Sequence, residues 1–298
     1  MTDTGNAASG GLPSSGDETA ESLAARARDG DGEALVALIG RVQDDVYRLS
    51  LRMLWHPQDA EDATQEILFR IVTSVATFRG ESTFRTWALR VATNHLLNIR
   101  RSRIEKQALT FDAFGKDLAD GLADPADASA PRADEADQRL LEEEVKIGCT
   151  QAMLLCLDRD ERIAYVLGDV FELRSDEAGE VLGIDPAAYR KRLSRARGRV
   201  RQFMEDHCSL VNTDAPCSCA RRVRPAIGRG RINPENPLFA GRAPASPRRL
   251  PVLEAVGEME RLHEIAAIHQ SHPKYKAPAR VAHTIRRVLQ SPEWRMLR

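Results

Sequence analysis

Apolar residues in the second half of the chain recur at a spacing that is typical of one face of an α-helix. Five of them are separated by 4, 3, 4 and 3 positions. The same period runs through residues 21–102 and 146–204, and residues 21–102 contain no alternating strand pattern with turn residues at its ends. We therefore predict an all-α protein. The five seam residues are Tyr189, Leu193, Ala196, Val200 and Phe203.

The other faces of this helix are strongly basic. Residues 190–201 contain seven lysines and arginines and no acidic residue. A surface helix of an ordinary bundle is the alternative, but such a one-sided composition would be unusual for it. The pattern favours a helix that binds DNA.

The residues before the basic helix predict a second, shorter helix and a tight turn. Ser175 is suited to cap a helix over 176–182, and Gly183 suits the left-handed position that ends it. Asp185 can cap the basic helix, with Pro186 in its first turn. A short helix, a turn with glycine and a longer basic helix are typical of a helix-turn-helix motif.

An acidic helix is predicted over residues 59–78, with Asp59 as its N-cap. Besides a buried apolar stripe, it has a polar face that includes Asp62, Glu66 and Phe69. A phenylalanine with an acidic rim is typical of a protein-binding surface. The alternative interpretation, that Phe69 belongs to a wide core stripe, is equally compatible with the spacing.

A loop over 78–84 precedes the next predicted helix, which Ser82 can cap and which extends to about Arg101. One face of this helix carries arginine and asparagine without acidic residues. Arginine suits phosphates and guanine, and asparagine suits adenine or an unpaired base edge. A solvated basic face is the alternative. The residues of this face are Arg90, Asn94, Leu97, Asn98 and Arg101.

The net charge of −1, from 43 basic and 44 acidic residues, suggests at first that nucleic acid is not a ligand. The charge is unevenly distributed, however: residues 78–103 carry +5, residues 104–145 carry −8, and residues 220–298 carry +10. The near-neutral total is a cancellation between basic helices and an acidic, Asp- and Ala-rich segment that we interpret as a linker.

These patterns predict five parts of the chain. A disordered N-terminus (1–20) precedes a helical domain (21–103), the acidic linker (104–145), a helix-turn-helix domain (146–206) and a C-terminal extension (207–298). In the extension, a loop rich in Pro, Gly and Arg over 225–251 is followed by helices at about 252–270 and 278–290.

Several function classes are disfavoured. No apolar run approaches the length of a membrane span, and Met1–Glu21 does not resemble a signal peptide. Five cysteines, an odd number, argue against a disulfide scaffold and for a cytoplasmic location. No phosphate-binding loop, nucleophile elbow or catalytic carboxylate pair is evident, so we expect no enzymatic activity.

Three cysteines and one histidine cluster at the start of the extension. This set suits tetrahedral zinc, although Cys-x-Cys is not the usual zinc knuckle. A redox pair and purely structural cysteines are the alternatives, and no cofactor is required. Cys149 and Cys156, seven positions apart in an apolar helix, are expected in the core. The candidate metal ligands are His207, Cys208, Cys217 and Cys219.

The motifs in this order resemble a bacterial RNA polymerase sigma factor of the sigma-70 family, specifically the extracytoplasmic function (ECF) group. The matching segments are Asp59–Glu66, Phe78–Asn94, Asp176–Asp185 and Arg192–Arg197. The resemblance covers about residues 30–204, and the cysteine segment at the start of the 207–298 extension resembles a cysteine-containing C-terminal extension found in some ECF factors.

The resemblance implies that the 59–69 face binds the β′ subunit of core RNA polymerase, through Asp59, Asp62, Gln65, Glu66 and Phe69. It implies that the 78–101 loop and helix recognise and melt the −10 promoter element, through Phe78, Arg79, Ser82, Thr83, Phe84, Arg85, Trp87, Arg90, Asn94, Asn98 and Arg101. It implies that the basic helix reads the −35 element, through Ala187, Tyr189, Arg190, Lys191, Arg192, Ser194, Arg195 and Arg197.

The resemblance also implies the partners: core RNA polymerase (β and β′ subunits), promoter DNA, and an anti-sigma factor or other regulator, without a membrane. The acidic linker would run through the polymerase near its active cleft. Residues 188–191 depart from the run common in the family, which leaves the −35 sequence open. The rival hypothesis is a stand-alone helix-turn-helix regulator with a metal- or redox-sensing C-terminal segment.

Overall fold

The computed structural model describes residues 18–99, 109–123, 135–240 and 258–290. The described residues form helices joined by turns and loops, and their one bridge of β type pairs Cys208 with Cys217. The all-α prediction is therefore confirmed. No helix among these residues is long and apolar enough to cross a membrane.

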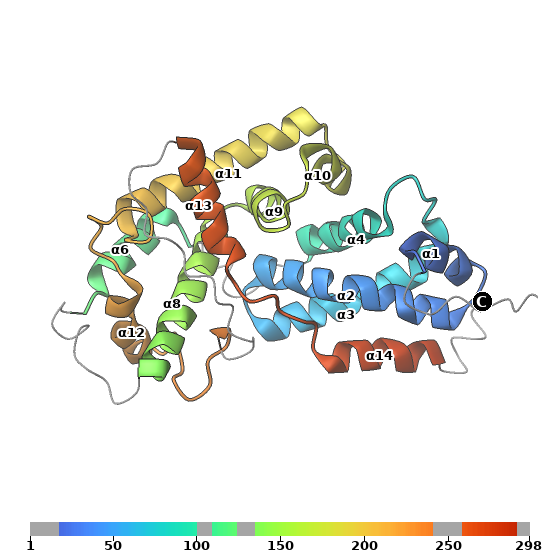
Figure 1. The fold of residues 1–298 in the computed structure, drawn as a ribbon, viewed down its shortest axis with the longest axis horizontal. Helices are drawn as coiled ribbons and strands as arrows, with labels where there is room; N and C mark the ends of the chain where they lie inside the picture. Colours follow the sequence, from blue (N-terminus) through green and yellow to red (C-terminus); the bar gives the residue numbers. More distant parts are fainter. Residues whose placement is uncertain (1–17, 100–108, 124–134, 241–257, 291–298) are drawn as a thin grey trace, which may run out of the picture.

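The N-terminal helices form the first domain (Figure 1). Its elements are α1 (Ala20–Arg28), α2 (Gly32–Leu54), α3 (Pro57–Ser74), η1 (Val75–Thr77) and α4 (Phe84–Asn98). The long helix α2 packs on α1, α3 and α4, and apolar side chains fill the space between them. The disorder predicted for residues 1–20 falls mostly outside the described residues.

Helix ends in this domain differ from the predicted ones by a few positions. His56, not Asp59, is the N-cap of α3, because its ring nitrogen accepts a hydrogen bond from the Gln58 amide at 3.2 Å. Thr83, not Ser82, caps α4 by accepting from the Thr86 amide at 3.1 Å. Helix α4 ends at Asn98, short of the predicted Arg101.

The helix-turn-helix domain consists of α8 (Glu135–Cys156), α9 (Arg159–Tyr165), a π-helical turn η2 (Val166–Val170), α10 (Ser175–Leu182) and α11 (Pro186–His207). The predicted turn is confirmed: Gly183 is left-handed, with φ of 65°, and the Asp185 side chain caps α11. Ser175 is the first residue of α10 rather than its cap.

The acidic segment is more structured than a simple linker. It contains a helix, α6 (Phe111–Asp120), and its last residues form the start of α8. Phe111 and Phe114 pack against Phe203 of α11, each with ring centroids 5.2 Å apart. The apolar face of α6 thus places it against the helix-turn-helix domain.

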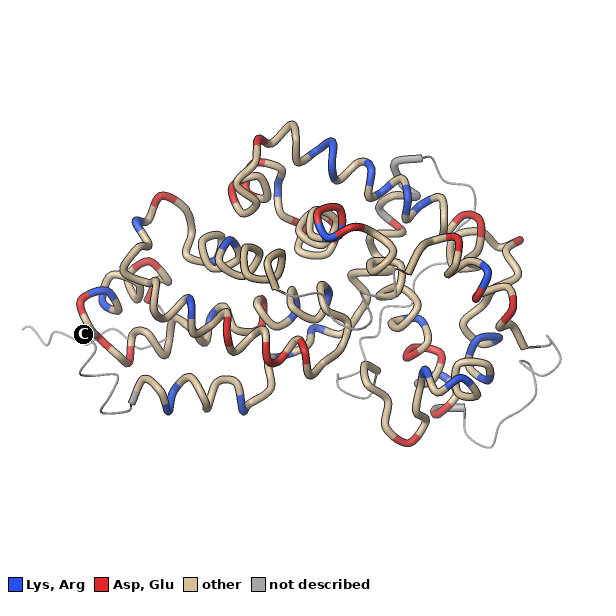
Figure 2. The backbone as a smooth tube through the Cα atoms, turned by 180° about the vertical axis from the view of Figure 1, so that it is seen from behind, with Lys and Arg blue, Asp and Glu red and all other residues tan. Residues whose placement is uncertain are grey.

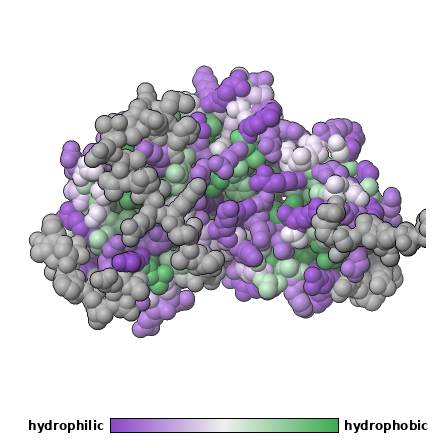
Figure 3. All heavy atoms as spheres, viewed as in Figure 1, coloured by the Kyte–Doolittle hydropathy of each residue, from purple (hydrophilic) through white to green (hydrophobic). Residues whose placement is uncertain are grey.

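In the described part of the C-terminal extension the helices are α12 (Cys219–Gly228), α13 (Glu258–Gln270) and α14 (Ala279–Gln290). The predicted Pro-rich loop begins later than expected, since Pro225 lies inside α12. Helix α13 packs on η2, α11 and α8, whereas α14 packs on α2 and α3 (Figure 1). Polar side chains cover most of the described surface on this side of the molecule (Figure 3).

Candidate nucleic-acid interface

The start of α11 presents a basic surface to solvent. Asp185 accepts a hydrogen bond from the Ala187 amide at 2.7 Å, which fixes the first turn of the helix. From this turn toward the C-terminal end of α11, basic residues recur along the helix (Figure 2). The helix-turn-helix geometry makes this end the one that would enter a major groove. The exposed predicted residues are Ala187, Arg190, Lys191, Ser194 and Arg195.

Two residues predicted to read DNA have partners inside the protein. Tyr189 is fully buried, and its hydroxyl donates to the Ala164 carbonyl at 3.1 Å. The Arg197 Nε lies 3.0 Å from each carboxylate oxygen of the buried Asp169. Burial raises the pKa of Tyr189, and the Asp169 carboxylate raises the pKa of Arg197. The prediction of DNA contact is therefore wrong for Tyr189, whereas Arg197, which is 38% exposed, stays a predicted contact. Both residues hold α11 on the helices before it.

Two further arginines of α11 are partly engaged with acidic residues of α9. Arg192 lies 3.4 Å from the Asp160 carboxylate, and Arg195 lies 3.6 Å from that of Glu161. Arg190 and Lys191 form no ion pair within the described part of the chain. The free cationic groups are thus concentrated in the second turn of α11.

A recess of about 430 Å³ lies beside the exposed face of α4. Arg90 and Asn94 of α4 are exposed at it, and Asn98, one turn further on, is also exposed. The recess therefore gathers cationic and amide groups that can contact phosphates and base edges. Of the predicted −10 residues it is lined by Phe78, Arg79, Ser82, Trp87, Arg90 and Asn94.

The aromatic residues of this segment form a small core rather than an open stacking surface. Phe78 and Phe84 are buried, and with Trp87 they form a cluster with centroids 5.4 to 5.7 Å apart. Only Trp87 is partly exposed. Phe78 and Phe84 are predicted as base contacts, but their packing assigns them to holding the loop on α4.

Other predicted −10 residues have structural partners or are not described. The Arg85 guanidinium lies 2.5 Å from the Asp45 carboxylate of α2, which directs it away from the recess. Thr83 is the cap of α4, and Arg101 lies outside the described residues.

The acidic face of α3 is confirmed as a solvent-facing surface. Asp59, Asp62 and Glu66 are exposed, and Gln65 is half-buried. Phe69 is 44% exposed and is the only large hydrophobic residue of the described chain in that class. The structure thus favours the interpretation of Phe69 as an anchor for a partner over its assignment to the core.

A second recess, of about 780 Å³, lies between α3 and α4 and joins these two surfaces. Glu66 of α3 and both Asn94 and Asn98 of α4 line it. His95 lies 3.4 Å from Glu66 at this position, and burial lowers the pKa of His95. The acidic surface of α3 and the candidate DNA-binding surface of α4 are therefore adjacent.

Sequence reasoning missed a contact between the two domains. The Thr86 hydroxyl of α4 donates to the Glu177 carboxylate of α10 at 3.2 Å. Glu180 of α10 also lines the recess beside Arg90 and Asn94. No local sequence pattern predicts a contact between two residues about 90 positions apart.

Residues 208–218 form turns between α11, which ends at His207, and α12, which begins at Cys219, and a backbone bridge joins Cys208 to Cys217. The His207 ring packs on Phe203 with centroids 4.8 Å apart. No group of three or more His, Cys, Asp or Glu residues in the described chain is arranged to hold a metal ion. The zinc site at His207, Cys208, Cys217 and Cys219 stays a prediction that this geometry does not support.

Two family models match the chain, sigma-70 region 2 over residues 38–104 and sigma-70 region 4 over residues 147–200. The ECF RNA polymerase sigma factor SigC of Mycobacterium tuberculosis is 30% identical over 61% of this chain and 90% of its own length. The chain is an ECF sigma factor.

Other ECF sigma factors match a similar share of the chain. SigW of Bacillus subtilis is 29% identical over 60% of this chain and 93% of its own length. SigE of Mycolicibacterium smegmatis is 31% identical over 58% of this chain, and the match spans 62% of that relative. The solved structure of CnrH in complex with the cytosolic domain of CnrY aligns with a TM-score of 0.43 at 18% identity, over 61% of this chain and 95% of that one. By the two family models, region 2 comprises most of the first domain, and region 4 covers most of the helix-turn-helix domain.

Proposed function

We propose that this sigma factor binds core RNA polymerase, directs it to promoters with matching −10 and −35 elements, and assists DNA melting. It acts as an initiation factor in the cytoplasm and not as an enzyme, because RNA synthesis is carried out by the polymerase. The proposal rests on one observation: each of the two matched sigma domains exposes a surface of the predicted kind. The first domain exposes the acidic face of α3 with Phe69, and the second exposes the basic start of α11.

Each surface has a distinct task in this proposal. Asp59, Asp62, Gln65, Glu66 and Phe69 bind the polymerase, with Phe69 as the apolar anchor inside a charged rim.

The DNA contacts come from the two recognition helices. Arg90, Asn94 and Asn98 of α4 contact the −10 element, where asparagine amides suit unpaired base edges. Arg190, Lys191, Ser194 and Arg195 of α11 contact the −35 element in the major groove.

Run-off transcription with purified core polymerase and a promoter library tests the proposal. The expected result is initiation that depends on both the added protein and the promoter sequence. Absence of transcription that depends on core polymerase would refute it. The rival, a stand-alone helix-turn-helix regulator, predicts binding to duplex promoter DNA without polymerase. It leaves the exposed acidic face of α3 without a role.

A further inference from the structure

Among the described residues, the C-terminal extension contacts the first domain, the linker helix and the helix-turn-helix domain. Helix α12 packs on α8, α13 packs on α8, η2 and α11, and α14 packs on α2 and α3. It therefore connects region 2, the linker helix α6 and region 4, although it follows all of them in the sequence (Figure 1).

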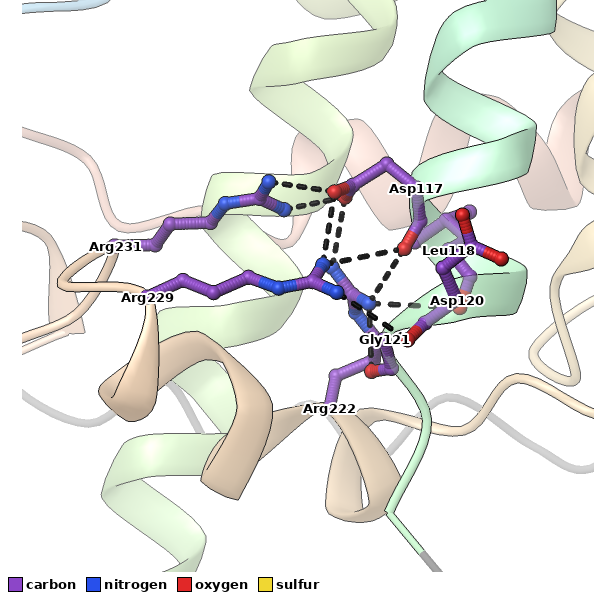
Figure 4. Close-up of polar contacts among 7 residues, drawn as sticks. All are labelled: Asp117, Leu118, Asp120, Gly121, Arg222, Arg229 and Arg231. Atoms are coloured by element: carbon purple, nitrogen blue, oxygen red, sulfur yellow. Dashed lines mark hydrogen bonds and ion pairs between the residues drawn. The ribbon is translucent and has the colours of Figure 1, made fainter.

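Three arginines of the extension converge on one carboxylate of the linker (Figure 4). Asp117 of α6 is paired with Arg222 at 3.2 Å, with Arg229 at 2.8 Å and with both guanidinium nitrogens of Arg231. The Arg231 hydrogen bonds and the charges of the three guanidinium groups lower the pKa of Asp117. We call these four residues the Asp117 clamp. The three guanidinium groups would repel one another without the Asp117 carboxylate between them, so the clamp depends on that carboxylate.

The clamp also closes the end of α6. Arg222 is largely buried and donates to the Gly121 carbonyl at 2.7 Å and to that of Asp117 at 3.1 Å, which satisfies carbonyls that the helix leaves free. A Cβ atom at Gly121 would overlap the guanidinium groups of Arg222 and Arg229, so glycine permits this close approach.

At the other end of the extension, α14 is fixed to region 2. The Ala277 amide, just before this helix, donates to the Asp44 carboxylate of α2 at 2.9 Å. Arg280 pairs with the buried Glu61 of α3 and donates to Gln58 at 3.1 Å. Gln58 and Glu61 lie on the helix whose neighbouring face presents Asp62 and Phe69.

With both ends held, the −10-reading helix α4 packs against α10, the helix that precedes the −35-reading helix α11. Glu177 and Glu180 of α10 lie against the α4 surface that carries Arg90 and Asn94. The carboxylates at this contact oppose the approach of phosphates to that surface.

The packing of α6 on region 4, which the clamp reinforces because α12 packs on α8, also limits how far the two domains can separate. The −10 and −35 elements lie about 85 Å apart along B-DNA, at about 3.4 Å per base pair. With α6 fixed to region 4, roughly a dozen residues join it to α4 and reach at most about 40 Å. Even with the roughly 33 Å length of α11 added, this reach is shorter than the distance between the two promoter elements. A released linker of roughly 35 residues, with α6 still helical, reaches about 100 Å.

We propose that the C-terminal extension is an intramolecular inhibitor that holds the sigma factor closed by binding the linker helix at Asp117 and region 2 through α14. Promoter binding then requires the Asp117 clamp to open. This inference rests on the proposed function for its consequence in transcription, whereas the closed geometry stands independently of it.

The test uses the full-length chain with Asp117→Arg, which places a fourth positive charge in the clamp. The matched control is Asp112→Arg, an equal charge change at an exposed position of the same helix. A compact chain of this length has a radius of gyration of about 19 Å. Small-angle scattering should show a clear increase for Asp117→Arg and none for the control. Core-dependent transcription should rise at least about fivefold for Asp117→Arg, a typical coupling between two states.

Asp117→Asn, which removes the negative charge and keeps the shape of the side chain, should act in the same direction and covers the case in which Asp117→Arg fails to fold. Unchanged scattering for both variants overturns the clamp. Expansion without increased transcription, in a protein whose wild type does initiate, overturns its inhibitory role. If no form supports initiation, the proposed function fails, and scattering alone then decides whether the clamp holds the chain closed.

Discussion

The hydroxyl of Thr86 donates to the carboxylate of Glu177, and this bond joins α4 of region 2 to α10, the first helix of the helix-turn-helix in region 4. Thr86 is buried and Glu177 is half-buried, so the bond lies in a partly buried interface between the two domains. Region 2 and region 4 are therefore in direct contact with each other in this structure.

The first prediction separates two arginines of α11. Arg197→Ala should lower the free energy of unfolding by about 1–3 kcal/mol, because it leaves the buried Asp169 carboxylate without its partner. This loss is smaller than that for a fully buried ion pair, because the Arg197 side chain is 38% exposed. Arg190→Ala should leave stability unchanged but relax the preference for the −35 sequence. Urea unfolding and binding to −35 variants measure the two effects. Equal stability losses would refute the assignment.

The second prediction concerns the acidic face of α3. Asp62→Arg should weaken binding to core polymerase at least about tenfold, since it reverses a charge in the rim around Phe69. Because Asp62 is exposed, the free energy of unfolding of the protein should change by no more than about 0.5 kcal/mol in this variant. Fluorescence titration with core polymerase and urea unfolding check the two parts. Unchanged affinity would place the polymerase-binding surface elsewhere.

The third prediction distinguishes the core of the −10 segment from its surface. Phe84→Ala should cost about 3–5 kcal/mol of stability, because Phe84 is fully buried against Phe78 and Trp87. Asn94→Ala should leave stability intact and slow promoter opening. Thermal unfolding and a permanganate footprint of the melted bases measure these outcomes. A stable Phe84→Ala variant that fails only in melting would restore Phe84 as a DNA contact.

The fourth prediction is a loss of stability in acid. Burial, and next the Arg52 guanidinium, lower the pKa of His269 to about 3 and that of His272 well below its ordinary value. The unfolded state therefore binds more protons below pH 6.5, and the free energy of unfolding should fall by up to about 1.4 kcal/mol per pH unit for each histidine. The stability is complete above pH 6.5 and is lost as the pH falls toward the folded-state values.

Urea unfolding at pH 7, 6 and 5 measures this slope. His269→Phe should flatten it, since the ring that packs on Tyr165 is kept while the titrating group is removed. His283→Gln, at an exposed position of α14, is the matched control and should leave the slope unchanged. A slope that both variants preserve would assign the acid sensitivity to other groups.

The fifth prediction addresses the thiols. Burial raises the pKa of Cys208 to about 11 and those of Cys156 and Cys219 to about 12. The reactive thiolate is therefore scarce at pH 8, and iodoacetamide should modify these cysteines at least about 100-fold more slowly in the folded than in the unfolded protein.

Mass spectrometry of cysteine peptides follows the alkylation. Rapid native modification of Cys208 would favour the redox-sensing hypothesis. Metal analysis of the same reduced sample tests the zinc prediction, and stoichiometric zinc that persists in Cys217→Ser would exclude the predicted ligand set.

The helices could be predicted because their signals are local. The spacing of Tyr189, Leu193 and Phe203 defines a buried face whatever packs on it, and Gly183 is left-handed because an α-carbon without a side chain adopts that conformation at little cost. The helix caps were less predictable. The observed N-caps are His56, Thr83 and Arg174. Each lies one to three residues from the predicted cap, and moving a helix end by that much costs little free energy.

The candidate site was only partly predictable, because periodicity shows which residues share a face but not what that face meets. Phe69 and Phe84 have the same chemistry, yet one is exposed and the other is buried. Arg190 and Arg197 lie on one basic helix, yet only Arg197 meets a buried carboxylate, which lies 28 positions earlier in the chain.

The sequence by itself determined the α-helical class, the two sigma domains and the charge of their helices, because these depend on residues within a few turns of each other. Only the tertiary structure decided which side chains remain available and which parts meet. The contact of Thr86 with Glu177 and the clamp at Asp117 join residues about 90 to 115 positions apart. Such pairs form only where packing offsets the entropy of closing a long loop, and no local pattern records that balance.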